Sequence, residues 1–90
     1  AAQDEAPYVR VAAGEALCCL DQLDAGLTAL TAGLEHPLAT VRLAAASALE
    51  GLGPKARGAR PAIKHAADDS NQYVVRIAQA LLAQLAGDEQ

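Results

Sequence analysis

Three segments of the chain repeat one helical pattern at almost equal intervals. They read VRVAAGEALCCL from residue 9, VRLAAASALEGL from residue 41 and VVRIAQALLAQL from residue 74, so their starts lie 32 and 33 residues apart. Counted from each first valine, positions 0, 4, 7, 8 and 11 are apolar in all three, and at 100° per residue they form one stripe on a helix. We therefore expect one buried stripe per segment, made of Val9, Ala13, Ala16, Leu17, Leu20, Val41, Ala45, Ala48, Leu49, Leu52, Val74, Ala78, Leu81, Leu82 and Leu85.

Two shorter helical segments, LDAGLTALTAGL and ARGARPAIKHAA, separate the three repeats. The chain shows no period-two run and no hairpin turn between β-rich segments, so no strand is expected. The sequence thus predicts one all-α domain over residues 1–90. Its five helices are expected at 7–21, 24–35, 37–52, 58–67 and 71–86.

Residues that typically cap or end helices lie near the predicted ends of these helices. Asp24 is a possible N-cap of the second helix, and Ser70 or Asn71 can cap the last one. Gly53 followed by Pro54 favours the end of the third helix, and Pro61 suits the first turn of the fourth.

The composition favours thin, closely stacked helices. The chain has no Phe, Trp or Met, and its apolar content rests on 23 Ala and 13 Leu. Alanine has the highest helix propensity, and small side chains let helix axes approach closely. Ninety residues suit one small domain with a thin core.

Charge and hydropathy exclude two classes of partner. A net charge of −4 argues against nucleic acid, which requires a basic surface. The cluster of Lys55, Arg57 and Arg60 is interpreted as a solvated loop. No apolar run reaches the roughly 20 residues of a membrane span.

The order of the helices is long, short, long, short, long. If each short helix pairs with the long helix after it, the first long helix lacks its partner. We therefore expect that the chain is a fragment whose neighbouring helix lay upstream, and that the exposed side of the first helix, with Leu17 and Leu20, supports weak self-association.

The segments DEAPYVRVAAGEAL and HPLATVRLAAASALEGLGPKARGARPAIKHAADDSNQYVVRIAQALLAQL resemble HEAT-like repeats, and especially the HEAT-like segment at the C-terminus of some bacterial sulfatases. The resemblance covers residues 4–85. The residues that carry it most specifically are His36-Pro37, Val41-Arg42, Gly53, Lys55-Ala56-Arg57, Asn71 and Tyr73-Val74.

The resemblance implies a right-handed α-α superhelix, a HEAT-like solenoid of about two and a half repeats. It also implies a non-catalytic interaction or structural module, belonging to a larger protein such as a sulfatase, whose partner is another protein or the parent's catalytic domain. A sulfatase parent would place it in the periplasm or outside the cell, and another parent in the cytoplasm. The alternative is a free-standing scaffold or adaptor that binds a protein partner on its concave face.

The chain departs from both patterns. In the third repeat Val75 occupies the place of the arginine, and Arg76 follows one residue late. The sulfatase nucleophile motif, Cys or Ser followed by x-Pro-x-Arg, is absent, because neither Cys18 nor Cys19 has a proline two residues later.

No residue cluster predicts a reaction, a metal site or a cofactor. His36 and His65 are interpreted as a loop and a surface residue, and residues 68–71 as a solvated turn without the ligand spacing of a calcium loop. Catalysis by the repeats themselves, as in lyase-like or DNA-repair relatives, is the third hypothesis.

The candidate partner-binding face lies opposite the predicted stripe, on the second helix of each pair, which the resemblance places on the concave surface. Ordinary surface apolarity is the competing interpretation of its exposed Val and Leu. On the same geometry Cys18 should be more exposed than Cys19, and no basic neighbour activates it. The candidate residues are Val11, Glu15, Leu43, Ser47, Glu50 and Arg76.

Overall fold

The computed structural model describes residues 2–88, with side chains for residues 6–87. Over this range the chain is helical and contains no strand, so the all-α prediction is confirmed. Residues 1, 89 and 90 of the expected domain lie outside the described part. The elements are α1 (Ala2–Cys19), α2 (Leu23–Leu34), α3 (Ala39–Leu52), the 3-10 helix η1 (Gly53–Ala59), α4 (Arg60–Ala66) and α5 (Gln72–Asp88).

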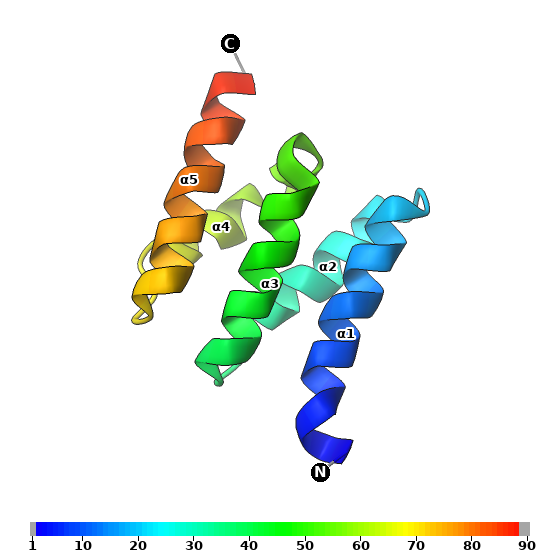
Figure 1. Cartoon of the computed structure of the whole chain (residues 1–90). Helices are drawn as coiled ribbons and strands as arrows, with labels where there is room; N and C mark the ends of the chain where they lie inside the picture. Colours follow the sequence, from blue (N-terminus) through cyan, green and yellow to red (C-terminus); the bar gives the residue numbers. More distant parts are fainter. Residues whose placement is uncertain (1, 89–90) are drawn as a thin grey trace.

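The helices form two layers. The long helices α1, α3 and α5 lie side by side and run in the same direction, and α2 and α4 cross behind them (Figure 1). The three principal extents are 45, 32 and 16 Å, and the shortest is what two layers of helices require. Each long helix therefore has a neighbour within its own layer and a shorter helix behind it.

The breaks between helices follow local rules. Gly53 adopts φ +58°, a left-handed conformation that favours glycine, and α3 ends at the residue before it. Pro61 lies in the first turn of α4, as predicted. Asn71 caps α5, because its side-chain oxygen accepts the backbone N–H groups of Tyr73 and Val74 at 2.9 and 3.2 Å.

Several predicted boundaries were wrong. Helix α1 begins one turn earlier than residue 7, because Pro7 removes one hydrogen bond without stopping the preceding turn. Helix α3 begins two residues later than expected, since Leu38 is extended and its N–H is bound by the His36 side chain. Asp24 lies inside the first turn of α2 and is not its N-cap. The expected helix 58–67 divides into the end of η1 and α4.

The core is aliphatic and lies between the two layers. Its fully buried large side chains are Leu30, Leu49, Ile63, Leu81, Leu85, Val41 and Val74. The predicted stripe is correct in α3 and α5, where every member is buried or half-buried.

The predicted stripe is wrong in α1. Val9 is 62% exposed and Leu20 70%, and Ala13 and Ala16 are also exposed. The buried side of α1 is instead formed by Pro7, Val11, Gly14 and Cys18. In α3 the stripe packs against the α1–α2 pair, whereas no described element covers the corresponding side of α1.

Candidate partner-binding surface

The open face of the long-helix layer carries one equivalent residue from each repeat along its edge. Tyr8, Thr40 and Tyr73 each precede the repeat's first valine, and all three are exposed. The hydroxyl groups of Tyr8 and Thr40 are hydrogen-bonded at 2.6 Å, which connects α1 to α3 on this side. We call this row and the exposed residues beside it, Glu15, Ser47 and Ala80, the outer face.

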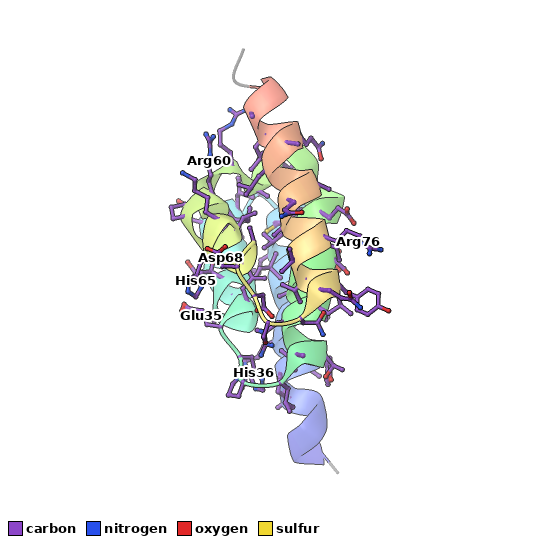
Figure 2. All side chains as sticks on the ribbon, turned by 90° about the vertical axis from the view of Figure 1, so that its left-hand side faces the viewer. Glu35, His36, Arg60, His65, Asp68 and Arg76 are labelled. Atoms are coloured by element: carbon purple, nitrogen blue, oxygen red, sulfur yellow. The ribbon has the colours of Figure 1, made fainter. Side chains whose placement is uncertain are left out.

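Four of the six predicted binding residues are exposed in the structure. Glu15, Ser47, Glu50 and Arg76 are accessible to a partner. Figure 2 shows Arg76 on the opposite side of the molecule from His65 and Asp68, which lie on the side of α4. Whether these residues bind a partner stays a prediction.

Two predicted residues are less accessible than expected. Val11 is 6% exposed, and its Cγ2 lies where α1 meets Gly33 of α2 and Ala45 of α3. The prediction of an exposed Val11 was therefore wrong, because α1 turns this residue toward both neighbours. Leu43 is half-buried and packs against the core.

The relative exposure of the two cysteines was also predicted the wrong way round. Cys18 is 4% exposed and Cys19 is exposed, and both are free thiols. Burial raises the pKa of the Cys18 thiol, and the neighbouring Cys19 and Glu15 add to this effect while Lys55 opposes it. The Cys18 Sγ donates only weakly to the Leu23 carbonyl, at 4.0 Å. This environment favours an unreactive thiol.

An ion pair that the sequence analysis missed connects two loops at one end of the molecule. Arg42 Nε lies 2.8 Å from Asp69 Oδ2, and its Nη2 lies 3.2 Å from Oδ1, so the pair is bidentate. The Nη1 of Arg42 also donates to the carbonyl oxygens of His36 and Pro37, at 2.9 and 2.8 Å. The segment 68–71 is therefore not simply a solvated turn. The Val-Arg pair of the second repeat was the available signal, but it did not specify a partner 27 residues away.

Partial burial by itself raises the pKa of Asp69, but other contacts outweigh it. The backbone N–H of Asn71 donates to Asp69 Oδ1 at 2.8 Å, and the Arg42 guanidinium adds hydrogen bonds and opposite charge. The pKa of Asp69 therefore lies below its ordinary value of 3.8. The carboxylate is ionised at neutral pH and acts as a structural link.

The two histidines are placed by local contacts. His36 is half-buried and its Nδ1 accepts the Leu38 N–H at 3.1 Å, whereas His65 is exposed on α4.

Among the described side chains, no three His, Cys, Asp or Glu residues are grouped closely enough to hold a metal ion. No helix in the described range is long and apolar enough to span a bilayer.

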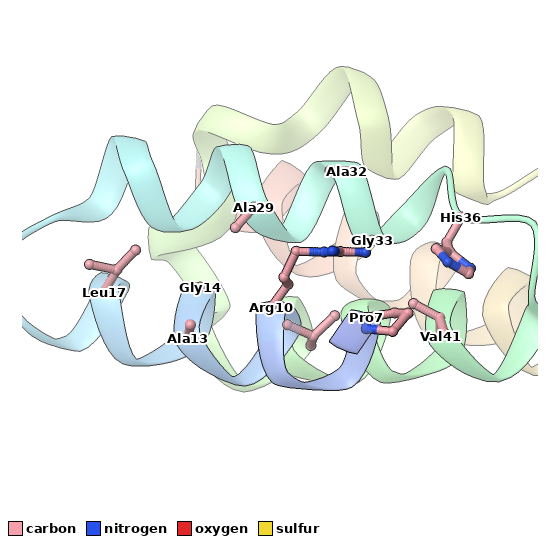
Figure 3. Close-up of a pocket in the computed structure, with 11 residues that line it drawn as sticks. Pro7, Arg10, Ala13, Gly14, Leu17, Ala29, Ala32, Gly33, His36 and Val41 are labelled. Carbon is pink, nitrogen blue, oxygen red and sulfur yellow. The ribbon is translucent and has the colours of Figure 1, made fainter. Parts of the chain in front are cut away.

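A second accessible region is a groove between α1 and α2, at the end of the layer where α1 lies. Its volume is about 250 Å³, and its lining is mostly small or aliphatic (Figure 3). Arg10 extends across it, and Leu17 and Ala29 contribute from the two helices. This groove continues the exposed side of α1.

The paired, layered helices agree with what comparison with known families shows. The family model of HEAT repeats matches residues 1–86. The chain belongs to the HEAT-repeat family. No curated protein and no solved structure matches it. HEAT repeats commonly mediate protein interactions or act as scaffolds.

Proposed function

We propose that this HEAT-repeat chain is a non-catalytic interaction module that binds a protein partner on its outer face. The observation that carries the proposal is the continuity of this face across the three parallel helices α1, α3 and α5 (Figure 1). Tyr8, Thr40 and Tyr73 hold the same repeat position on it and are all exposed. Tyrosine is enriched at protein interfaces because it offers a large contact area and a polar group together. Glu15 and Arg76 add charges of opposite sign at the two ends.

The mechanism is passive presentation of a rigid surface. Stacked repeats hold their outer residues at fixed spacing because each helix pair packs against the next. The hydrogen bond between Tyr8 and Thr40 restricts the conformations of these two side chains before a partner binds. A preorganised surface loses less conformational entropy on binding.

The test has two steps. In the first step, the chain is expressed in cells with a photo-crosslinking amino acid in place of Tyr73, and the protein that it captures is identified. In the second step, this protein is purified and its affinity for the unmodified chain is measured by calorimetry. We expect Tyr73→Ala to weaken binding at least tenfold, in the range found for interface hot spots. His65→Ala on the exposed side of α4 is the matched control, and equal affinities of the two variants would rule out the outer face.

A bacterial sulfatase as the parent protein is a further proposal, supported by the sequence resemblance alone. If this proposal is correct, the complete reading frame should contain a Cys or Ser followed by x-Pro-x-Arg upstream of these repeats. A reading frame without such a domain favours the alternative, a free-standing scaffold or adaptor.

A further inference from the structure

The positive charge of this chain is concentrated in one short stretch. Residues 51–67 contain four of the seven Lys and Arg residues and none of the eleven Asp and Glu residues. The four are Lys55, Arg57, Arg60 and Lys64. The remaining sequence has three basic and eleven acidic residues, so its formal charge is −8, whereas that of residues 51–67 is +4. A short surface of one sign on a molecule of the other sign attracts a different class of partner from the rest of the molecule.

This stretch is helical and rigid. It forms η1 and α4, which follow each other without a gap, and Pro54 and Pro61 lie at the start of the two helices. The interpretation of Lys55, Arg57 and Arg60 as a solvated loop was therefore wrong about the backbone, which is helical at all three residues. Proline restricts φ, so this backbone loses little conformational entropy when a partner binds.

The inward and outward sides of this segment have opposite character. The inward side chains are buried and apolar, and a Cβ built on Gly58 would lie 3.0 Å from the Leu27 Cδ1 of α2. The outward side carries the charges, because Lys55, Arg57 and Lys64 are all exposed. Packing against the core thus holds these three charged residues on the surface. The inward residues are Ala56, Ala59, Ile63 and Ala66.

Three of the four charges are available to a partner. Within the described part of the chain, Lys55, Arg57 and Lys64 form no ion pair. Arg60 is different, because it is half-buried and already engaged in an interaction within the protein. Figure 2 shows Arg60 on the side of α4, away from Arg76. We call Lys55, Arg57 and Lys64 the basic surface.

The basic surface is short. From Lys55 to Lys64 the two helices rise by about 16 Å at most, at roughly 2 Å per residue in η1 and roughly 1.5 Å in α4. Acidic residues border this surface, since Asp24 lines the groove between α2 and Gly58, and Asp68 is exposed directly after α4. About five extended residues, or about three turns of a helix, cover such a length.

A short acidic segment of a protein fits this surface better than a long polyanion does. Double-stranded DNA carries a negative charge about every 1.7 Å of its axis, and an anionic membrane is a continuous plane of charge. Either would extend past the basic surface and meet the remaining chain, whose formal charge is −8. Like charges that face each other across an interface are unfavourable. A segment with three carboxylates ends where the basic surface ends.

We propose that the basic surface binds a short acidic segment of a protein partner, with one carboxylate beside each of Lys55, Arg57 and Lys64. The three ion pairs are exposed to solvent, so each contributes modestly, and the complex is weak and sensitive to salt. Helix α4 lies in the layer behind the long helices (Figure 1), so this contact does not use the outer face. A failed test of either surface therefore leaves the proposal for the other unchanged.

Titration of an acetylated hexaglutamate peptide into the isotope-labelled chain, followed by NMR, tests the surface. In about 50 mM salt we expect saturable shifts of the backbone amides of residues 53–66 and none at Tyr8 or Tyr73. At about 300 mM salt the Debye length falls to about 6 Å, and the affinity should fall about threefold. Hexaglutamine has the same length without the charge and should not shift these signals. Shifts that are absent, or that spread over all helices, overturn the proposal.

Charge variants test which residues bind the peptide. Arg57→Gln should weaken binding about two- to fivefold, the effect of one exposed ion pair, and a further Lys55→Gln should weaken it again. Arg10→Gln is the matched control, since it removes the same charge from an exposed arginine of α1. Equal losses in Arg57→Gln and Arg10→Gln would refute the site. Tighter binding of anionic vesicles, or of an oligonucleotide of the same charge, would refute an acidic protein segment as the partner.

Discussion

At the scale of single residues, the close approach of α1 and α2 depends on Gly26. A Cβ at this position would overlap the Cys18 Sγ and would come within 2.5 Å of the Gly14 carbonyl oxygen and 2.9 Å of the Cys18 backbone nitrogen. Two of these three obstacles are backbone atoms, which cannot move away as a flexible side chain can. The absence of a side chain at Gly26 therefore determines how closely α1 and α2 approach.

We predict that Gly26→Ala destabilises the fold by about 3 kcal/mol, at the upper part of the range for overpacked cores. The measurement is the free energy of unfolding in urea, followed by circular dichroism. Gly51→Ala is the matched control, because no atom lies within 4 Å of its added Cβ. In an exposed helix position alanine should stabilise by about 0.8 kcal/mol. Similar changes in the two variants would contradict this account of Gly26.

At the scale of elements, Arg42 in the first turn of α3 pairs with Asp69 in the loop before α5 and also donates to the carbonyl oxygens of His36 and Pro37 in the loop before α3. The first repeat lacks the residues for an equivalent pair. Arg10 stands at the position of Arg42 one repeat earlier, but the residue that corresponds to Asp69 is His36, which supplies no carboxylate. The connection between α3 and the loop before α5 is thus strengthened by charge.

This pair predicts a loss of stability in acid. Because the folded pKa of Asp69 is lowered, its contribution is complete above the unfolded value of about 3.8 and is lost as pH falls through the lower folded pKa. We expect Asp69→Asn to lower the free energy of unfolding by about 1.5–3 kcal/mol at pH 7, the range for hydrogen bonds to charged groups. The difference from wild type should shrink below pH 3.8.

Urea unfolding between pH 7 and pH 2 measures this difference. Asp68→Asn is the control, since the adjacent carboxylate is exposed and should contribute little. If the two variants lose the same stability at every pH, the ion pair makes no special contribution.

At the scale of the whole molecule, the two ends of the helix layer determine how it can associate. Position 2 of the repeat is Val11 in α1, Leu43 in α3 and Arg76 in α5, so the same position changes from buried to half-buried to exposed. Polar side chains on the outward side of α5 make it unfavourable to bury that side against an apolar surface.

Removing that polarity should therefore change the mode of assembly. We predict that the double variant Arg76→Leu with Gln79→Ala lets the outward side of α5 accept the exposed apolar side of α1, with Val9, Ala13 and Ala16, from another chain. Such head-to-tail contacts do not close, so oligomers of increasing size should form with concentration. Multi-angle light scattering measures them. A variant with the same mass distribution as the wild-type chain would argue against Arg76 and Gln79 as the residues that prevent this contact.

The sequence by itself was sufficient for the helices and their order. The periodic apolar positions, Gly53 at the end of α3, Pro61 at the start of α4 and Asn71 at the start of α5 all act through contacts within a few residues. Such local interactions can be read from spacing and residue type. The HEAT-like resemblance was confirmed for the same reason, because the family pattern is carried by these repeating positions.

Only the tertiary structure decided which side of α1 is buried. Both sides of this helix are apolar, with Val11 and Cys18 on one and Val9, Ala13 and Ala16 on the other. Periodicity shows that a helix has an apolar side, but burial requires a neighbour, and α2 and α3 lie on one side alone. The pairing of Arg42 with Asp69 depended in the same way on loops brought together by the packing of whole helices.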